Sequence, residues 1–435
     1  MHILFILPYD TTYRYKTAFM PAISYEPLTL STLAALVPEE LNATITLVDE
    51  GVRKFNYSKQ KYDLVGITST TSSAPRAYEL ATFFKKQGSY VLLGGHHVTL
   101  MPDEASAYAD TIFTGNAECT FPRFFEDYKC GTPQARYTSE GVNASLMPLP
   151  RRDLMPKKGY MSHPTIIADY GCPNHCKYCV IHSFWGNNSK RPVADVVNEI
   201  KQLKKRNFIL LDPSPFANKT YARELLEAFT ALKIKWVGLA ALDIVKDEKL
   251  LDLIQQSGCI GLLTGFETFN SDNLADMYKH KNKISEYKEL VQKMHQRQIS
   301  VLGTFMVGFD GDTLESLKKL PDLIDEIQVD VPRFAILTPY PNTPIFNELA
   351  GQERIFTRDW SKYDSIQCVY KPLYMSPDEL EQAFINVWKE CYTFKRIFKR
   401  FKMAQQRKFT TLITNIGFKI YANKLPALIH KAKMK

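Results

Sequence analysis

The sequence has few cysteines, no long hydrophobic run and no composition bias of the kind found in disordered chains. No apolar stretch reaches the roughly 18 to 20 residues that a membrane-spanning helix requires. The eight Cys among 435 residues are too few and too unevenly spaced for a disulfide framework. The content of 45 % hydrophobic and 23 % charged residues excludes a disordered or fibrous protein. We therefore expect two or three globular domains in a reducing, cytoplasmic compartment, where grouped cysteines more often bind metal.

Acidic residues are absent from the C-terminal end. Residues 395–435 contain 12 Lys and Arg and no Asp or Glu, whereas residues 1–394 contain 43 basic and 46 acidic residues. The main body is therefore near neutral, and we expect no nucleic-acid binding through a broad basic face. A basic amphipathic helix is predicted here. It could lie on an anionic membrane surface, or pack its apolar stripe onto the body of the protein. The apolar positions are Phe394, Ile397, Phe398 and Phe401.

Residues 1–130 alternate short apolar runs with helical patterns. The first run, Ile3 to Pro8, follows no basic segment and precedes no small-residue cleavage site, so it is interpreted as a strand and not as a signal peptide. Apolar strands separated by helices predict an α/β fold with a doubly wound, Rossmann-like parallel sheet, whose ligand lies beyond the carboxyl ends of the strands. The expected strands are 2–7, 44–49, 63–68, 90–93 and 110–114, and the expected helices are near 27–38, 74–87 and 119–128.

Small and hydroxyl-bearing residues follow the third, fourth and fifth of these strands. Such residues let a large ligand approach the backbone, and their hydroxyls can donate hydrogen bonds. No G-x-G-x-x-G pattern follows the first strand, which disfavours a dinucleotide. The alternative is that these segments are ordinary βα turns. The candidate ligand contacts are Thr68, Ser69, Ser72, Gly94, Gly95, His97, Thr99, Gly115 and Glu118.

The rest of the chain divides into a linker, a second α/β domain and a helical end. Proline and glycine cluster in residues 131–163, which predicts the linker. Over residues 164–345 six βα units predict a partial (β/α)6 barrel with its site at the carboxyl ends of the strands. Residues 346–435 are expected to form a C-terminal α-helical region. The expected barrel strands are near 165–169, 207–211, 234–239, 259–265, 299–306 and 330–337, and the helices are 192–205, 217–231, 246–256, 284–297 and 312–326.

The most specific motif is a group of three cysteines with the spacing C-x3-C-x2-C. Cys172, Cys176 and Cys179 follow the apolar run 165–168, at the expected active rim of the barrel. Three thiolates on one short loop can hold three corners of a [4Fe–4S] cluster and leave the fourth iron open to a substrate or cofactor. Zinc, with His175 or His182 as the fourth ligand, is the alternative. It is disfavoured because structural zinc sites usually use two separated C-x2-C pairs.

At these residues the sequence resembles the radical S-adenosylmethionine (SAM) enzymes, whose signature is C-x3-C-x2-C after the first strand of a partial barrel. The N-terminal domain, with its Gly94-Gly95 loop, looks like the cobalamin-binding domain of the B12-dependent branch, including hopanoid-type methylases. Gly115-Asn-Ala-Glu118 is similar to the Gly-Glu-Gly-Glu turn of that branch, with departures at Asn116 and Ala117. The resemblance therefore implies three cofactors, a [4Fe–4S] cluster, SAM and cobalamin.

The same resemblance implies roles for individual residues. Tyr178 would lie beside the cluster and the adenine, and Glu267 would be a polar contact to SAM. Asp212 would contact the methionine end of SAM, although relatives often read Asp-Asp-Asn where this chain has Asp-Pro-Ser. Gly303 and Thr304 would line the adenine. The chain lacks Asp-x-His-x-x-Gly, so cobalamin is expected base-off without a histidine ligand, and His97 would be a wall or tail contact.

The implied activity is methylation of an unactivated carbon through a 5′-deoxyadenosyl radical and methylcobalamin. No side chain is nominated as a catalytic nucleophile, because the cofactors supply the chemistry. The expected partners are a small-molecule or lipid-like substrate and an electron donor such as flavodoxin or ferredoxin, with peripheral contact at the inner membrane face through the basic tail. The alternatives are a radical SAM cyclase or rearrangement enzyme with the same cofactors, and a non-catalytic corrinoid or cluster carrier.

Overall fold

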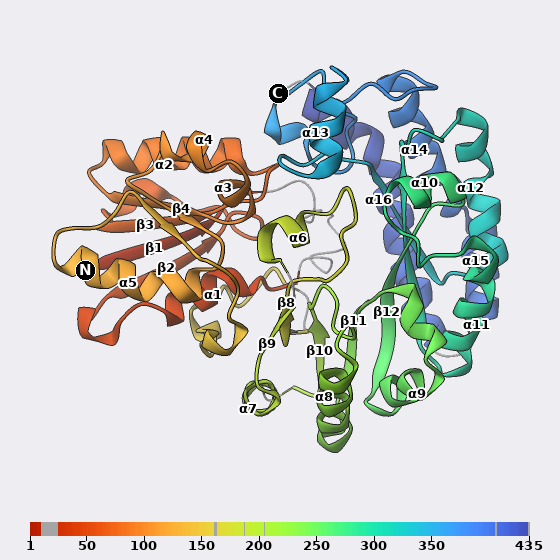
Figure 1. Cartoon of the computed structure of the whole chain (residues 1–435), viewed down its shortest axis with the longest axis horizontal. Helices are drawn as coiled ribbons and strands as arrows, with labels where there is room; N and C mark the ends of the chain where they lie inside the picture. Colours follow the sequence, from red (N-terminus) through yellow and green to blue (C-terminus); the bar gives the residue numbers. More distant parts are fainter. Residues whose placement is uncertain (10–24, 161–162, 187, 204, 405–406, 434–435) are drawn as a thin grey trace. The chain divides into compact units, whose positions relative to one another are not determined.

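The computed structural model of the chain describes residues 1–9, 25–160, 163–186, 188–203, 205–404 and 407–433 (Figure 1). The chain divides into two compact units. The first contains Met1–Asn174, Cys179–Lys205 and Tyr340–Thr343, and the second contains His175–Tyr178, Arg206–Pro339 and Pro344–Lys435. The boundary therefore runs through the cysteine motif, with Cys176 in the second unit. The finer domain boundaries given above stay a prediction.

A six-stranded parallel sheet forms the centre of the first unit. Alternate residues of a strand face opposite sides, so the sheet has two apolar faces. Leu4 and Ile6 pack on the face covered by α2, α3 and α4, whereas Ile3 and Phe5 pack on the face covered by α1 and α5 (Figure 1). The strand order is β2 (Thr44–Asp49), β1 (His2–Leu7), β3 (Leu64–Thr68), β4 (Tyr90–Gly94), β5 (Thr111–Thr114), β6 (Arg136–Thr138). The helices are α1 (Leu28–Ala35), α2 (Ala74–Lys86), α3 (His96–Leu100), α4 (Pro102–Ser106) and α5 (Ala117–Lys129).

This arrangement confirms the predicted doubly wound sheet. The five strands expected from the sequence are present within one residue of their predicted ends. The sequence does not predict the edge strand β6, because three residues with one buried side chain, Tyr137, carry too little periodicity to be recognised.

Strands β10 to β14 of the second unit pair in parallel, in sequence order, so their carboxyl ends share one edge. Each of the first four is followed by at least one helix, which confirms the predicted strand–helix alternation. The strands are β10 (Asn207–Leu210), β11 (Lys235–Ala240), β12 (Cys259–Glu267), β13 (Ser300–Val307) and β14 (Val331–Ile336). The helices are α8 (Lys219–Leu232), α9 (Glu248–Gln256), α10 (Ser271–Asp276), α11 (Tyr287–Gln296) and α12 (Leu314–Ile327).

Helices dominate the C-terminal region of the second unit, as predicted. Helix α14 packs through Trp388 against Phe334 of β14, with the ring centroids 5.1 Å apart. The basic amphipathic helix is α15, whose bounds coincide with the apolar and basic pattern read from the sequence. In the described part of the chain, no helix combines the length and apolar character needed to cross a membrane. The helices are α13 (Pro344–Gly351), α14 (Pro377–Cys391), α15 (Phe394–Met403) and α16 (Lys408–Lys433).

Candidate functional site

Three turns at the carboxyl edge of the first sheet are hydrogen-bonded to one another. The backbone N–H of Ser69 donates to Gly94 O over 3.0 Å, and the N–H of Gly115 donates to the Thr99 hydroxyl over 2.9 Å. His97 N–H donates to Ser69 O over 3.3 Å. The structure therefore brings together the predicted ligand contacts that follow three different strands. We call these turns, residues 68–72, 94–99 and 115–118, the glycine-rich rim.

Gly95 allows the closest approach within this rim. Its φ is +100°, in a region that side-chain-bearing residues rarely adopt. A Cβ at this position would lie 2.6 to 2.7 Å from the backbone of Ser69 and the hydroxyl of Thr68. Within the described residues, the buried hydroxyl of Ser69 has no hydrogen-bond partner. Since a buried polar group without a partner is costly, it is suited to a polar ligand such as the amide-rich edge of a corrin ring.

His97 lies behind the rim rather than on an open face. Its ring is fully buried, with Nε2 3.2 Å from Glu104 Oε1 and the Tyr78 ring 6.2 Å away between centroids. Burial lowers the pKa of His97, and the hydrogen bond to Glu104 only partly offsets this shift. The imidazole is therefore neutral near pH 7 and engaged with protein groups.

Residues on both sides of the cysteine motif contact the rim within the first unit. Tyr170, in β8 (Asp169–Tyr170), donates from its hydroxyl to Glu118 Oε1 over 3.0 Å. Burial raises the pKa of Glu118 even though this hydrogen bond opposes the shift. After the motif, α6 (Val180–Trp185) places Phe184 4.3 Å and Trp185 5.7 Å from the His96 ring, measured between centroids. The ends of the cysteine loop are thus fixed to the rim.

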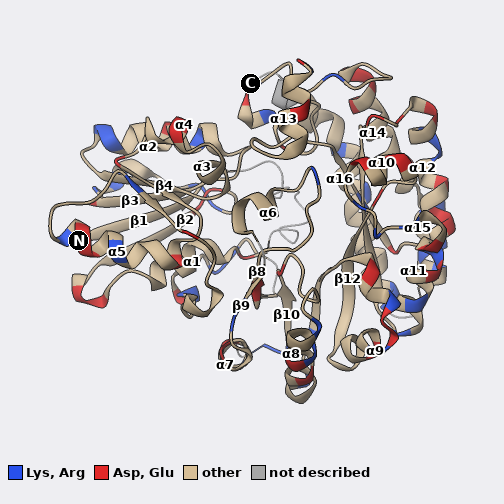
Figure 2. Cartoon of the chain, viewed as in Figure 1, with Lys and Arg blue, Asp and Glu red and all other residues tan. Residues whose placement is uncertain are grey.

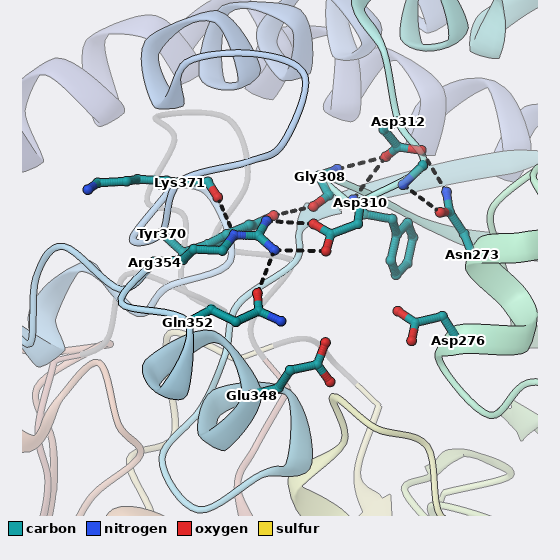
Figure 3. A network of polar contacts seen from close by, with 12 residues as sticks. Asn273, Asp276, Gly308, Asp310, Asp312, Glu348, Gln352, Arg354, Tyr370 and Lys371 are labelled. Atoms are coloured by element: carbon teal, nitrogen blue, oxygen red, sulfur yellow. Dashed lines mark hydrogen bonds and ion pairs between the residues drawn. The ribbon is translucent and has the colours of Figure 1, made fainter.

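The middle of the cysteine loop is held in the second unit by Lys177. Its Nζ lies 2.8 Å from Asp276 Oδ1 and 2.5 Å from Glu348 Oε2. Its backbone N–H donates to Met277 O over 3.3 Å, and its carbonyl accepts from Ile345 N–H over 3.1 Å. Burial opposes the charge of Lys177, but the two carboxylates outweigh it and raise the pKa. Figure 3 shows the side chains of Asp276 and Glu348.

A charged pair lies at the carboxyl end of β12. Glu267 has φ +68° and is largely buried, and its Oε1 accepts from Lys279 Nζ over 2.8 Å. Gly265 leaves the space into which this carboxylate folds, because a Cβ there would overlap Glu267 Oε1. Lys279 Nζ also lies 6.0 Å from the centroid of the Tyr178 ring, in the cysteine loop. A carboxylate, an ammonium group and an aromatic ring therefore lie close together at the cysteine loop.

The chain matches known proteins in sequence and in fold. The model of the radical SAM superfamily matches residues 166–324. Bacteriochlorophyllide d C-12(1)-methyltransferase of Chlorobaculum tepidum is 30% identical over 351 residues, which cover 78% of this chain and 76% of that protein. This chain belongs to the radical SAM superfamily. Hopanoid C-2 methylase of Rhodopseudomonas palustris is 22% identical over 91% of this chain and 75% of its own.

A solved structure confirms the predicted fold class of this radical SAM enzyme. TsrM of Kitasatospora setae, a radical SAM methyltransferase with tryptophan and a SAM analogue bound, superimposes with a TM-score of 0.67. The sequence identity is 16%, and the match covers 99% of both chains. TsrM has also been solved with cobalamin and a [4Fe–4S] cluster bound. The predicted family and kind of enzyme are confirmed by the match to the superfamily model and to the methyltransferase of Chlorobaculum tepidum, and the cofactors of TsrM are those predicted for this chain.

The three cysteines of this radical SAM enzyme are half-buried and form no disulfide. In the described residues, no three His, Cys, Asp or Glu side chains are arranged as a metal site. The motif is divided between the two units, and the chemistry of its donor atoms decides which metal they suit. Three soft thiolates on a loop of eight residues suit an iron–sulfur cluster, and thiolates are the ligands such clusters use. Ligation by Cys172, Cys176 and Cys179 stays a prediction.

The remaining predicted SAM contacts are dispersed along the second sheet. Asp212 lies just beyond β10 and is fully buried. Gly303 and Thr304 are neighbours in β13 and therefore face opposite sides of the sheet. A Cβ on Gly303 would meet Val329 at 3.0 Å, whereas the Thr304 hydroxyl donates to Thr264 O over 3.2 Å. Of this pair, only Thr304 offers a side chain on the face opposite Val329.

The loop after β13 is braced by a network that ties it to α10 and to the C-terminal region (Figure 3). Asp312 accepts from Gly308 N–H over 2.8 Å and from Asn273 Nδ2 over 2.9 Å. Arg354 forms a two-point ion pair with Asp310, over 2.8 and 2.6 Å. Burial raises the pKa of Asp312 to about 6, and its hydrogen bonds oppose this shift. The network holds α10, which carries Asp276, the partner of Lys177.

Several functional candidates are not recognised from the sequence. They are His96, Lys177, Phe184, Trp185 and Lys279. For Phe184 and Trp185 a signal exists, an aromatic pair one helical turn after the motif. For Lys279 there is none, because it lies in a run with two other lysines, Lys281 and Lys283, that face solvent.

Proposed function

We propose that this radical SAM enzyme methylates an unactivated carbon of a tetrapyrrole substrate, with cobalamin as the methyl carrier. One observation carries the proposal: the glycine-rich rim contacts both flanks of the cysteine motif, through Glu118 with Tyr170 and through His96 with Phe184. A corrin ring held by the rim would then lie near the end of the loop that binds the cluster. The transfer of a methyl group from SAM to cobalamin, and from there to the substrate, would require such proximity between cobalamin and the SAM beside the cluster.

The residues of the chain would bind, orient and exclude water, while the cofactors supply the reactive groups. When bound, they supply one-electron cleavage of SAM and a transferable methyl group. Cys172, Cys176 and Cys179 would hold the cluster. Flavodoxin or ferredoxin would supply the electron that reduces it. Glu267 would orient SAM, and the rim would hold the edge of a base-off cobalamin through small residues and the Ser69 hydroxyl.

The substrate class follows from the relatives and from the aromatic residues near the motif. The relative that is 30% identical acts on bacteriochlorophyllide d, a tetrapyrrole. Phe184 and Trp185 are partly exposed, and burial lowers the pKa of neighbouring His96 to about 4, so that ring is neutral. Neutral aromatic edges favour a flat apolar ring. A second candidate substrate is a hopanoid-like lipid, the substrate class of another relative.

The test is anaerobic reconstitution with iron, sulfide and cobalamin, followed by incubation with SAM labelled in its methyl group. Bacteriochlorophyllide and a hopanoid are offered separately, and the Cys176→Ala variant is the control. We expect labelled methyl on the tetrapyrrole together with 5′-deoxyadenosine. A ring-closed product without an added carbon would favour the cyclase alternative. Absence of 5′-deoxyadenosine in every reaction would favour a cofactor carrier.

We further propose that helices α15 and α16 contact an anionic membrane. The alternative, in which the apolar stripe packs onto the body, holds for Ile397, which is buried, but not for Phe394 and Phe398, which are 71% and 55% exposed. One basic residue of the helix that faces the body is Arg396, which pairs with Asp322 and Asp325 of α12, where Figure 2 shows acidic residues. Phe409 is 75% exposed, and no acidic residue follows residue 394.

This membrane contact is tested by sedimentation with liposomes that contain anionic or only neutral lipids. Replacement of Phe394, Phe398 and Phe409 by Ser should reduce the bound fraction on anionic liposomes at least tenfold. Replacement of Phe356, exposed elsewhere in the second unit, is the matched control. Equal binding of the wild type to both kinds of liposome, or no effect of the triple change, would contradict the proposal.

A further inference from the structure

The segment Asp276–Lys279, which we call the clamp segment, begins at the last residue of α10 and contacts the centre of the cysteine loop. Lys177 is bound by Asp276 through its ammonium and by Met277 through its backbone N–H. Lys279 Nζ lies 6.0 Å from the centroid of the Tyr178 ring, and Tyr178 stands between Cys176 and Cys179 in the sequence of the loop. Two consecutive residues of the loop, Lys177 and Tyr178, are thus contacted by three residues of the clamp segment, Asp276, Met277 and Lys279.

The position of Lys279 is fixed by its backbone. Its N–H donates to Leu274 O over 2.8 Å, and its carbonyl accepts from Asn282 N–H over 2.9 Å. The Asn282 side chain in turn donates to Gly265 O over 2.9 Å, which ties this turn to the end of β12. The Lys279 side chain is 22% exposed, whereas that of Lys281, two residues later, is 64% exposed. Of these two lysines, the fold turns Lys279 toward the loop.

Lys279 carries a positive charge in this setting. Burial works against the charge, but the carboxylate of Glu267 outweighs burial and raises the pKa of Lys279 well above its ordinary value. The ion pair with Glu267 spans 2.8 Å. A fixed ammonium in a partly desolvated place acts strongly on charge that appears nearby.

We propose that Lys279 sets the reduction potential of the cluster bound through Cys176, by stabilising its reduced form. In that step the external donor loses one electron and the cluster gains it, and no bond is formed or broken. A cluster with thiolate ligands becomes more negative by one charge on reduction, so a cation beside one of its ligands favours the reduced state. Glu267 moderates the effect, since its carboxylate partly neutralises the ammonium. The inference rests on the cluster in the proposed function, and not on cobalamin or on the substrate.

The test is a redox titration of the reconstituted protein followed by EPR, without SAM. In Lys279→Met we expect the ratio of reduced to oxidised cluster at a fixed solution potential to fall about tenfold, a shift of about 59 mV to lower potential for a one-electron couple. Lys279→Arg keeps the charge and should stay within about twofold of the wild type. Lys281→Met removes an exposed lysine of the same turn and should leave the titration unchanged.

A second variant keeps the proposal testable if Lys279→Met fails to hold a cluster. Glu267→Gln leaves the ammonium uncompensated and should shift the titration in the opposite direction, to higher potential. The proposal is overturned if Lys279→Met, with full iron content, titrates like the wild type. It is also overturned if both variants shift to lower potential, or if Lys279→Met weakens only the binding of SAM. A wild type without any cluster would instead contradict the proposed function.

Discussion

The carboxyl edges of the two sheets, each considered within its own unit, differ in chemistry. The rim of the first unit is built from glycines and hydroxyl residues, and at its centre Gly95, Ser69 and Thr99 bear no charge. The edge of the second unit is built from ion pairs, Lys279 with Glu267 and Lys177 with Asp276. Neutral donors and bare backbone suit a large ligand rich in amides, whereas fixed charges suit a cluster and a zwitterionic sulfonium. The contrast explains how one chain could hold cofactors of such different size and charge.

The largest expected effect comes from removing a thiolate at the charged edge. Cys176→Ala should abolish reductive cleavage of SAM, because a cluster with two remaining cysteine ligands is not held stably. The measurement is 5′-deoxyadenosine release after anaerobic reconstitution, together with the iron content. Cys130→Ala, at an exposed cysteine outside the motif, should release as much 5′-deoxyadenosine as the wild type. A fully active Cys176→Ala protein would show that the ligand assignment is wrong.

At the glycine-rich rim, a single added methyl group should be enough to prevent the binding of cobalamin. Gly95→Ala forces a Cβ against the Ser69 backbone at φ +100°, a strain of about 1 to 3 kcal/mol, and it closes the space at the rim. We expect cobalamin to be lost on gel filtration while the cluster is retained, as followed by absorption spectra. Gly88→Ala is the control, because φ there is also positive, at +83°, but no atom lies within 4 Å of the new Cβ. If both variants retain cobalamin equally, the rim does not bind it.

A third substitution tests whether Lys177 anchors the cysteine loop, a role distinct from the electrostatic role proposed for Lys279. Lys177→Met removes the anchor of the loop and should lower the free energy of unfolding by about 1 to 2 kcal/mol. This is less than the about 3 to 5 kcal/mol of a fully buried pair, because Asp276 and Glu348 are partly exposed. We expect about half the iron content at equal reconstitution. Lys319→Met, in an exposed pair with Glu315, should cost below about 0.5 kcal/mol and leave iron unchanged. An equal iron content in both variants would contradict the anchoring role.

The two edges also differ in how far the sequence predicts them. The rim is predicted well, because strand runs are readable from apolar residues and parallel strands bring their carboxyl ends to one edge. The ion pairs are not predictable in this way. Lys177 meets Asp276 across 99 positions of sequence, and nothing local distinguishes inward Lys279 from outward Lys281. Side-chain partners of this kind depend on how α10 packs, which periodicity does not specify.

The smallest expected effect concerns Asp312, in the network that braces α10. Burial raises its pKa to about 6, above the ordinary value of 3.8, so the folded state binds its proton more tightly than the unfolded state. The stabilising contribution is therefore complete below about pH 4 and is lost as the pH rises through about 6. In the metal-free protein, the thermal midpoint should fall over this range by a few degrees. Asp312→Asn should flatten that dependence, whereas Asp310→Asn, at the more exposed carboxylate of the same loop, should preserve it. If Asp312→Asn keeps the wild-type slope, another group is responsible for the pH dependence. Glu118 of the glycine-rich rim is then the candidate, because burial raises its pKa as well.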